Sequence, residues 1–421
     1  MKSLMGNGTI YLGAAAINVI VPFLALPPLV RSLPPQEFGR MGVYLALINI
    51  ATVLVGLSVH GIISVIHFRD GAHAVPRYVR GALQLMMLTG IPLIISSLVL
   101  APFLEKLTGL PGQWIWTAAV VALAQFIVAL GMAVFQAREE PVNYATLQIG
   151  VTIGWATLSI LLIWGAGIGW TGRAIGQLAA VITMALTTLL LLRRKGILVD
   201  SGVTAPLSTL LRFGLPLVPH SLAGAIMAGA DRLLLSNVGS PEMVGHYFAA
   251  FQICALITVG ASAVNQAWVP WLYKRLAAPT TATNSEIVRA TYLLNASLLL
   301  AALLLIIAAP LLVKIVAGEK YLEAVPAMRW LAPAAAFSGM YYFVTNYLFY
   351  CGRTGVLSSI TVCIAIFQII LLMVCVPRWG IEGAAFSSFI TAATYWLATW
   401  YAAHKVVPMP WATYLLKKPP V

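Results

Sequence analysis

The sequence is poor in charged side chains. Only 9% of its 421 residues are Asp, Glu, Lys or Arg, and 61% are hydrophobic, whereas an ordinary globular domain carries roughly 25% charged residues. Too few polar side chains are present to cover a water-facing surface of this size, but a bilayer solvates an apolar surface. The composition excludes a soluble globular protein and predicts a polytopic membrane protein.

Cysteines and sequence motifs for catalysis are also scarce. The four cysteines lie in apolar stretches, without the spacing of a metal site or a disulfide framework. The sequence contains no GxxxxGK[ST], HExxH or GxSxG motif, so we expect neither ATP hydrolysis nor the usual hydrolase chemistry. No cofactor is predicted, and this inventory favours a transporter over an enzyme.

Long apolar runs, by contrast, are abundant. A helix needs about 20 mostly apolar residues to cross about 30 Å of hydrocarbon, and clusters of Pro, Gly and charged residues separate such runs here. The runs predict twelve transmembrane helices at residues 9–30, 41–66, 81–104, 114–136, 144–165, 174–192, 213–236, 245–272, 290–313, 327–350, 355–376 and 383–404.

The few charged residues are mostly basic, with a net charge of +13. With a cytoplasmic N-terminus, 16 of the 25 Lys and Arg fall in cytoplasmic segments, as the positive-inside rule requires. The even number of spans then places both termini in the cytoplasm. Because the basic residues lie in short loops, anionic lipid head groups are the expected counter-charges and a nucleic acid is not.

A polar segment at residues 193–208 divides the twelve spans into two sets of six. We therefore predict an N-terminal six-helix bundle at residues 1–195, a cytoplasmic linker at 196–212, and a C-terminal six-helix bundle at 213–421 that ends in a short cytoplasmic tail. The predicted fold class is all-α, with two pseudo-symmetric bundles.

The two halves begin alike. Their first spans contain prolines, and each is followed by a similar loop: Pro35-Gln-Glu-Phe-Gly39 in the first half and Pro241-Glu-Met-Val-Gly245 in the second, 206 residues apart. Interrupted helices at matching places in two halves indicate a transport site. Chance similarity of two short loops is the alternative.

Polar side chains within spans are candidates for lining a cavity, because a charge at the helix centre costs on the order of 3 kcal/mol by insertion scales. The substrate-binding candidates are Asn18, Arg69, Gln125, Arg138, Arg232, Asn265, Gln266 and Lys274. The ion-coupling candidates are His60, His220 and Asp231. Hydrogen bonds between helices are the alternative role for the neutral residues, and interfacial anchoring is the alternative for the basic ones.

Several of these basic residues end spans on the predicted cytoplasmic side. Arg69, Arg138 and Lys274 together would surround the inner mouth of a central cavity with positive charge. Such a ring would attract an anionic, phosphate-bearing substrate from the cytoplasm.

A family resemblance rests on several segments of both halves. They are the stretch from Asn18 to Arg31, the loop Pro35-Gln-Glu-Phe-Gly39, Gly61, Arg69, Phe213-Gly-Leu-Pro-Leu-Val-Pro219, Ala230-Asp-Arg232 and Val244-Gly-His-Tyr247. In these segments the sequence resembles the Wzx-type O-antigen and polysaccharide repeat-unit flippases of the multidrug/oligosaccharidyl-lipid/polysaccharide (MOP) exporter superfamily, and the resemblance covers all twelve spans.

The resemblance implies a transporter that takes an undecaprenyl-diphosphate-linked oligosaccharide from the cytoplasmic to the periplasmic leaflet of the bacterial inner membrane. It implies alternating access driven by a proton or sodium gradient, with the lipid bilayer, a polysaccharide polymerase and a chain-length regulator as partners. A multidrug exporter or a lipid II exporter of the same superfamily, and a membrane polysaccharide polymerase, are the alternatives.

Overall fold

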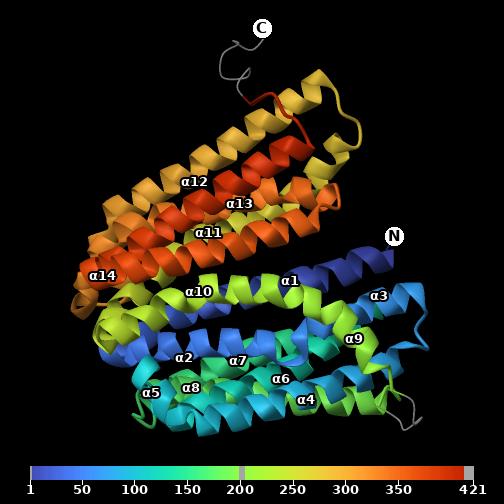
Figure 1. The fold of residues 1–421 in the computed structure, drawn as a ribbon, viewed down its shortest axis with the longest axis horizontal. Helices are drawn as coiled ribbons and strands as arrows, with labels where there is room; N and C mark the ends of the chain where they lie inside the picture. The colour runs from blue at the N-terminus through green and yellow to red at the C-terminus, as the bar shows by residue number, and fades with distance from the viewer. Residues whose placement is uncertain (1, 199–203, 412–421) are drawn as a thin grey trace. The chain divides into compact units, whose positions relative to one another are not determined.

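The computed structural model describes residues 2–198 and 204–411, and this part of the chain is helical with no strand (Figure 1). Residues 199–203 of the predicted linker and 412–421 of the predicted tail lie outside the described residues. The first elements are α1 (Lys2–Ser32), α2 (Pro35–Leu54), η1 (Gly56–Gly61), α3 (Ile62–Arg69), α4 (Val75–Val99), α5 (Ala101–Thr108), α6 (Gly112–Ala137), α7 (Pro141–Trp164) and α8 (Trp170–Arg194). They are followed by α9 (Leu207–Gly214), η2 (Leu215–Leu217), α10 (Val218–Val238), α11 (Pro241–Leu276), α12 (Thr281–Val316), η3 (Glu319–Ala324), α13 (Val325–Tyr350) and α14 (Thr354–Val406).

Several of these helices begin with residues that are favoured at the N-terminus of a helix. Pro35, Pro141 and Pro241 are the first residues of their helices, where the fixed φ of proline suits the helix and its missing N–H is not needed. At the start of α12 the Thr280 hydroxyl accepts from the Thr283 N–H at 3.1 Å, and the Thr283 hydroxyl accepts from the Thr280 N–H at 2.7 Å. This reciprocal capping satisfies two backbone donors.

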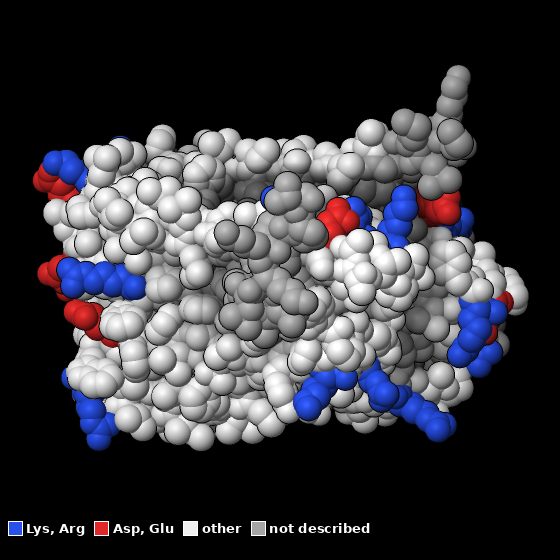
Figure 2. Space-filling view, turned by 90° about the horizontal axis from the view of Figure 1, so that it is seen from above, with Lys and Arg blue, Asp and Glu red and all other residues white. Residues whose placement is uncertain are grey.

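Ten helices of the described residues are long and apolar enough to cross a membrane. The predicted span 327–350 corresponds to α13, which is 26 residues long, and the predicted span 383–404 corresponds to the second arm of α14. Figure 2 shows that the charged side chains on the visible face gather toward the ends of the helices and leave an uncharged surface between them. The prediction of an all-α polytopic membrane protein is confirmed.

One face of α12 illustrates the uncharged surface. Leu300, Leu303, Leu304, Ile307 and Leu311 follow helical spacing, and their exposed fractions lie between 53% and 69%. Exposure of such an apolar stripe to water would be unfavourable, but lipid chains solvate it. This face is therefore suited to contact the bilayer.

The helix α14 is a hairpin of two arms. The hydroxyls of Thr361 and Tyr395 lie 2.8 Å apart although 34 residues separate them, which would place them about 51 Å apart in a straight helix. The chain reverses at Gly380, whose φ of 53° is unfavourable for residues with a Cβ. The two arms correspond to the predicted spans 355–376 and 383–404.

The predicted span 41–66 is not one continuous helix. Gly56, Leu57 and Ser58 have φ angles of 65°, 49° and 60°, and each left-handed residue with a side chain costs roughly 1–2 kcal/mol. The Gly56 N–H, released from the helical pattern, donates to the Thr89 hydroxyl of α4 at 2.9 Å. Tertiary hydrogen bonding thus helps to hold a break that contains no proline.

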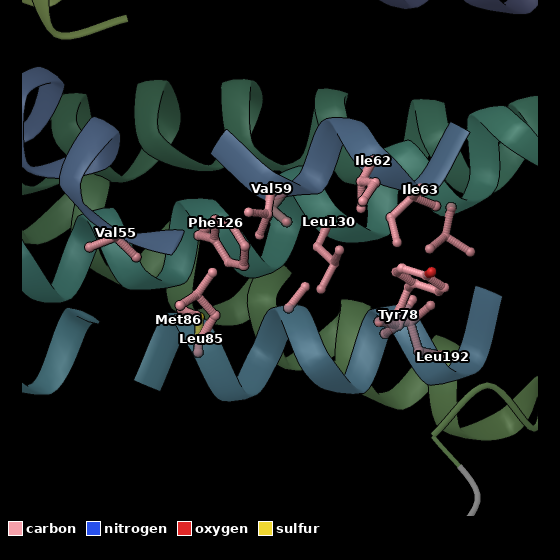
Figure 3. Packing of buried hydrophobic residues seen from close by; sticks show 14 of the residues in the cluster. Val55, Val59, Ile62, Ile63, Tyr78, Leu85, Met86, Phe126, Leu130 and Leu192 are labelled. Atoms are coloured by element: carbon pink, nitrogen blue, oxygen red, sulfur yellow. The ribbon is translucent and has the colours of Figure 1, made fainter. Parts of the chain in front are cut away.

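Buried side chains of η1, α3 and α6 pack around this break. Figure 3 shows Val59 beside Phe126 and Leu130 of α6, and all three side chains are at most 3% exposed. A Cβ at Gly56 would overlap the Phe126 ring. Because lipid is as apolar as these side chains, close packing rather than removal from water stabilises the contact.

The chain forms two compact units, one ending at Gly245 and the other beginning at His246. Helix α10, part of the seventh predicted span, packs on α2 and belongs to the first unit. The boundary of the units therefore lies after the seventh span, whereas the predicted six-plus-six division lies at residues 196–212. That division rests on the polar segment at residues 193–208 and stays a prediction.

The two repeated loops meet each other within the first unit. A Cβ added to Gly39 would overlap the Pro241 carbonyl oxygen, and a Cβ added to Gly245 would overlap the Pro35 carbonyl oxygen. Only glycine permits so close an approach of two backbones. We refer to residues 35–39 together with 241–245 as the Pro–Gly clasp.

The contact in the clasp is reciprocal, as expected where two copies of one motif meet at a two-fold axis. The Gln36 side-chain amide donates to the Glu242 carboxylate at 3.4 Å, and these residues are 206 apart, the same offset as the repeated loops. Equivalent residues touch only near such an axis. The clasp therefore supports the predicted internal repeat.

Candidate functional site

A polar cavity of about 360 Å³ lies inside the first unit, between α1, η1, α6, α7 and α8. Among the described residues its polar lining consists of amide, hydroxyl and imidazole groups and includes no acidic side chain. These polar residues are Asn18, His60, Gln125, Gln136, Tyr144, Gln148 and Thr152. The structure thus brings together three predicted site residues from three elements: Asn18, Gln125 and His60.

Helix α6 contributes two glutamines to the cavity. Gln125 and Gln136 are eleven residues apart, which is close to three turns and places them on one face. The Thr52 hydroxyl donates to the Gln125 side-chain oxygen at 2.9 Å. This contact orients the amide while leaving its N–H₂ group as a donor toward the cavity.

Helix α7 supplies a polar stripe that our sequence analysis missed. Tyr144, Gln148 and Thr152 follow at intervals of four and all line the cavity, so the helical period was a signal in the sequence. The Thr152 hydroxyl donates to the Asn18 side-chain oxygen. The Gln148 side-chain oxygen is buried and accepts no hydrogen bond from the described residues.

The break at residues 56–58 places His60 at the cavity. A second broken span lies next to this break. The Ser58 and Ser221 hydroxyls lie 3.5 Å apart, which joins η1 to the start of α10 just after η2. His220 lies at this junction but does not line the cavity. The Nδ1 atoms of His60 and His220 are both buried with no hydrogen-bond partner among the described residues.

Positive charge lies beside the cavity, where α6 ends. The Glu140 carboxylate binds Arg138 at 3.1 Å and Lys195 at 2.8 Å, and it accepts from the Asn143 amide at 2.6 Å. Burial raises the pKa of Glu140, but the bonds from Lys195 and Asn143 and the two cationic charges outweigh burial and lower it. Two cations share one carboxylate, so this cluster keeps a positive charge.

Other predicted residues of the first unit lie away from the cavity lining. Arg69 forms an exposed ion pair with Asp70 at 2.8 Å, and its side chain is 64% exposed. Asp231 and Arg232 are both buried in α10, with a carboxylate-to-guanidinium distance of 3.5 Å. Asp231 is therefore buried beside the guanidinium of its neighbour in the sequence.

The remaining candidates lie on α11 in the second unit. The Asn346 amide of α13 donates to the Asn265 side-chain oxygen at 2.8 Å, which is the helix-to-helix bond considered as the alternative role. Gln266 and Lys274 are exposed. These three residues belong to a different compact unit from the polar cavity.

Arg173 is a buried cation that the sequence analysis did not select. Its side chain is 6% exposed, its guanidinium lies 3.9 Å from the Trp155 ring centroid, and it donates to the Gln177 side-chain oxygen at 2.8 Å. No carboxylate pairs with it among the described residues. Arg173 lies in the first turn of α8 and one residue before the predicted span 174–192.

Two solved structures have the fold of this chain. The inward-facing conformation of a multidrug resistance MATE family transporter of the MOP superfamily has a TM-score of 0.75 at 14% identity, covering 94% of this chain and 97% of that one. The lipid II flippase MurJ in its inward closed conformation has a TM-score of 0.76 at 12% identity, covering 96% and 89%. This chain therefore has the helical fold of these membrane transporters.

The family follows from the sequence. Residues 4–276 match the model of the family described as "Polysaccharide biosynthesis protein", and the chain belongs to this family. It is also similar to two proteins of Haemophilus influenzae. One, an "Uncharacterized membrane protein", is 26% identical over 86% of this chain and 87% of its own length. The other, "Lsg locus putative protein 1", is 23% identical over 85% and 87%.

Proposed function

We propose that this protein flips an undecaprenyl-diphosphate-linked oligosaccharide, an O-antigen or similar repeat unit, from the cytoplasmic to the periplasmic leaflet of the bacterial inner membrane. Membership of the polysaccharide biosynthesis family supports a glycan substrate. The fold of MOP transporters supports alternating access. A diphosphate with several sugars needs a hydrated path because it cannot cross about 30 Å of hydrocarbon unaided.

The polar cavity of the first unit is the observation that carries this proposal. Gln125, Gln136 and Gln148 line it with side-chain amides, a group that can donate and accept hydrogen bonds, as the hydroxyl groups of a sugar require. An exporter of organic cations would need negative charge at its site, and none of the described residues that line this cavity is acidic. The lining therefore favours neutral glycan over a multidrug substrate.

The cationic cluster beside the cavity suits the diphosphate. Arg138 and Lys195 share the single carboxylate of Glu140, and charge-assisted hydrogen bonds to phosphate are among the stronger ones. Arg138 is our first candidate for the diphosphate contact. Arg69, Arg232 and Lys274 lie outside the cavity lining and are proposed as further contacts of the substrate.

Ion coupling is assigned to the junction of the two broken spans. His60 and His220 each have a buried Nδ1 without a partner among the described residues, and a histidine changes charge near physiological pH. A proton is the favoured ion and sodium is the alternative ion. Asp231 is the alternative ion-binding residue. Collapse of the pH gradient should then stop flipping, whereas an inhibitory effect of sodium removal alone would contradict the histidine assignment.

Deletion of the gene in its host tests the function. Complete lipid-linked repeat units should accumulate on the cytoplasmic face, protected in sealed spheroplasts and accessible after opening. Gln125→Leu and Gln148→Leu should reproduce the defect, whereas Gln113→Leu, an exposed glutamine of α6 outside the cavity, should not. Normal flipping with unpolymerised single repeats on the surface would instead indicate a polymerase.

Lipid II is the second candidate substrate, because the MurJ structure shares the fold over most of both chains. The same deletion strain separates the two substrates. Cytoplasmic accumulation of lipid II, with the surface glycan unchanged, would replace our proposal by this one. A polysaccharide polymerase and a chain-length regulator are proposed to act on the product after flipping.

A further inference from the structure

A second cavity, of about 490 Å³, lies in the second unit and has an aromatic lining. It lies between the beginning of α13 and the fold-back of α14, and it is lined by Trp330, Trp379, Glu382 and Phe386. Its volume is within the range of small-molecule sites, roughly 300–1,000 Å³. Three aromatic rings and one carboxylate therefore converge on one space.

The rings have a defined arrangement. Phe386 lies edge-on to both indoles, with centroid distances of 5.0 Å to Trp330 and 5.9 Å to Trp379 and interplanar angles of 84° and 86°. Trp330 also packs on Phe389 at 5.6 Å. Trp379 is 58% exposed. Packing fixes one indole while the other keeps most of its surface open.

The fold-back at Gly380 positions the polar groups. Glu382 is exposed and forms no ion pair with the described residues. The Arg378 guanidinium donates to the Val374 carbonyl at 2.7 Å, which directs it to the helix backbone instead of to Glu382. The carboxylate therefore remains a free acceptor at the edge of the aromatic cavity.

We infer that this cavity binds a neutral sugar ring of the translocated oligosaccharide. The indoles of Trp330 and Trp379 would pack on the apolar C–H face of the ring, and Glu382 would accept hydrogen bonds from two neighbouring hydroxyls. The inference rests on the proposed function. Under the predicted topology this end of α13 faces the periplasm, so the cavity would hold the glycan on the release side.

An aromatic cage with a carboxylate also suits an organic cation. Here the exposed Arg329 and Arg378 lie next to the two tryptophans in the sequence and outnumber the single carboxylate. The local charge is therefore positive, which disfavours a cationic ligand and is compatible with a neutral one.

Calorimetric titration of the purified full-length protein tests the inference. The glycan released from the host's lipid-linked precursor by mild acid is the first probe, and tetraphenylphosphonium is the second. We expect Trp379→Ala and Glu382→Gln to weaken glycan binding at least about tenfold, and Trp379→Phe and Glu382→Asp to retain most of it. Trp164→Ala, which removes a 64% exposed tryptophan of the first unit, is the matched control.

Equal glycan affinity in the wild-type protein and in Trp330→Ala/Trp379→Ala would overturn the inference, as would Glu382-dependent binding of tetraphenylphosphonium alone. Folding of each variant is checked by its elution as a monodisperse species and by its melting temperature. The spheroplast assay on the deletion strain remains independent. If lipid-linked repeat units did not accumulate on the cytoplasmic face of the deletion strain, the proposed flippase function would be refuted. If they did accumulate, but the variants bound the glycan as tightly as the wild-type protein, only this sugar site would be refuted.

Discussion

The Pro–Gly clasp makes the sharpest prediction. In Gly39→Ala the new Cβ would overlap the Pro241 carbonyl oxygen, and a backbone oxygen cannot rotate out of the way as a side chain can. Overpacking of this kind costs about 1–3 kcal/mol. If alternating access closes the clasp in one state and opens it in the other, only the closed state carries the cost. The equilibrium then moves toward the open state about 5–150-fold.

Disulfide cross-linking measures this shift. Gln36→Cys and Glu242→Cys would be introduced into a cysteine-free variant, because the native side chains are in contact at 3.4 Å. Added to this pair, Gly39→Ala should slow cross-linking. Gly245→Ala should do so to a similar extent because the contact is reciprocal. Gly224→Ala is the control, since a Cβ there meets nothing within 4 Å.

Unequal effects would refute the reasoning. If Gly39→Ala slowed cross-linking and Gly245→Ala left it unchanged, the clasp would not be a symmetric contact of two repeats. If neither changed the rate, the clasp would not open during transport. If Gly39→Ala lowered the melting temperature by the same amount with and without the cross-link, the clasp would have a purely structural role.

Three further outcomes are expected. Gln148→Leu should reduce surface glycan with little change in melting temperature, because the Gln148 side-chain oxygen has no hydrogen-bond partner to lose among the described residues. Asn346→Leu should destabilise the second unit by about 0.6 kcal/mol, the average for hydrogen bonds between membrane helices, and a double-mutant cycle with Asn265→Leu measures it. Glu140 has a lowered pKa, so its contribution to stability is complete above its ordinary value of 4.5 and is lost as the pH falls below it. Lys195→Met should flatten this acid-side loss in melting curves.

The sequence by itself determined the class, the number of spans and the family. Hydropathy is a local property of about 20 consecutive residues, so each apolar run could be recognised without knowing its neighbours. The offset of 206 residues between the two loops was equally visible. Even the pairing of Gln125 with Gln136 on one helical face followed from the helical period alone.

The tertiary structure decided which side chains form a site. The break at Gly56 contains no proline that could have revealed it in the sequence. A hydroxyl of α4 and the Phe126 ring help to hold this break, and the break places His60 at the cavity. Asn265 had two possible roles, and the bond from Asn346 on another helix selected one. These contacts join residues that are 33 to 81 positions apart. They depend on how the helices pack, and composition carries no record of that packing.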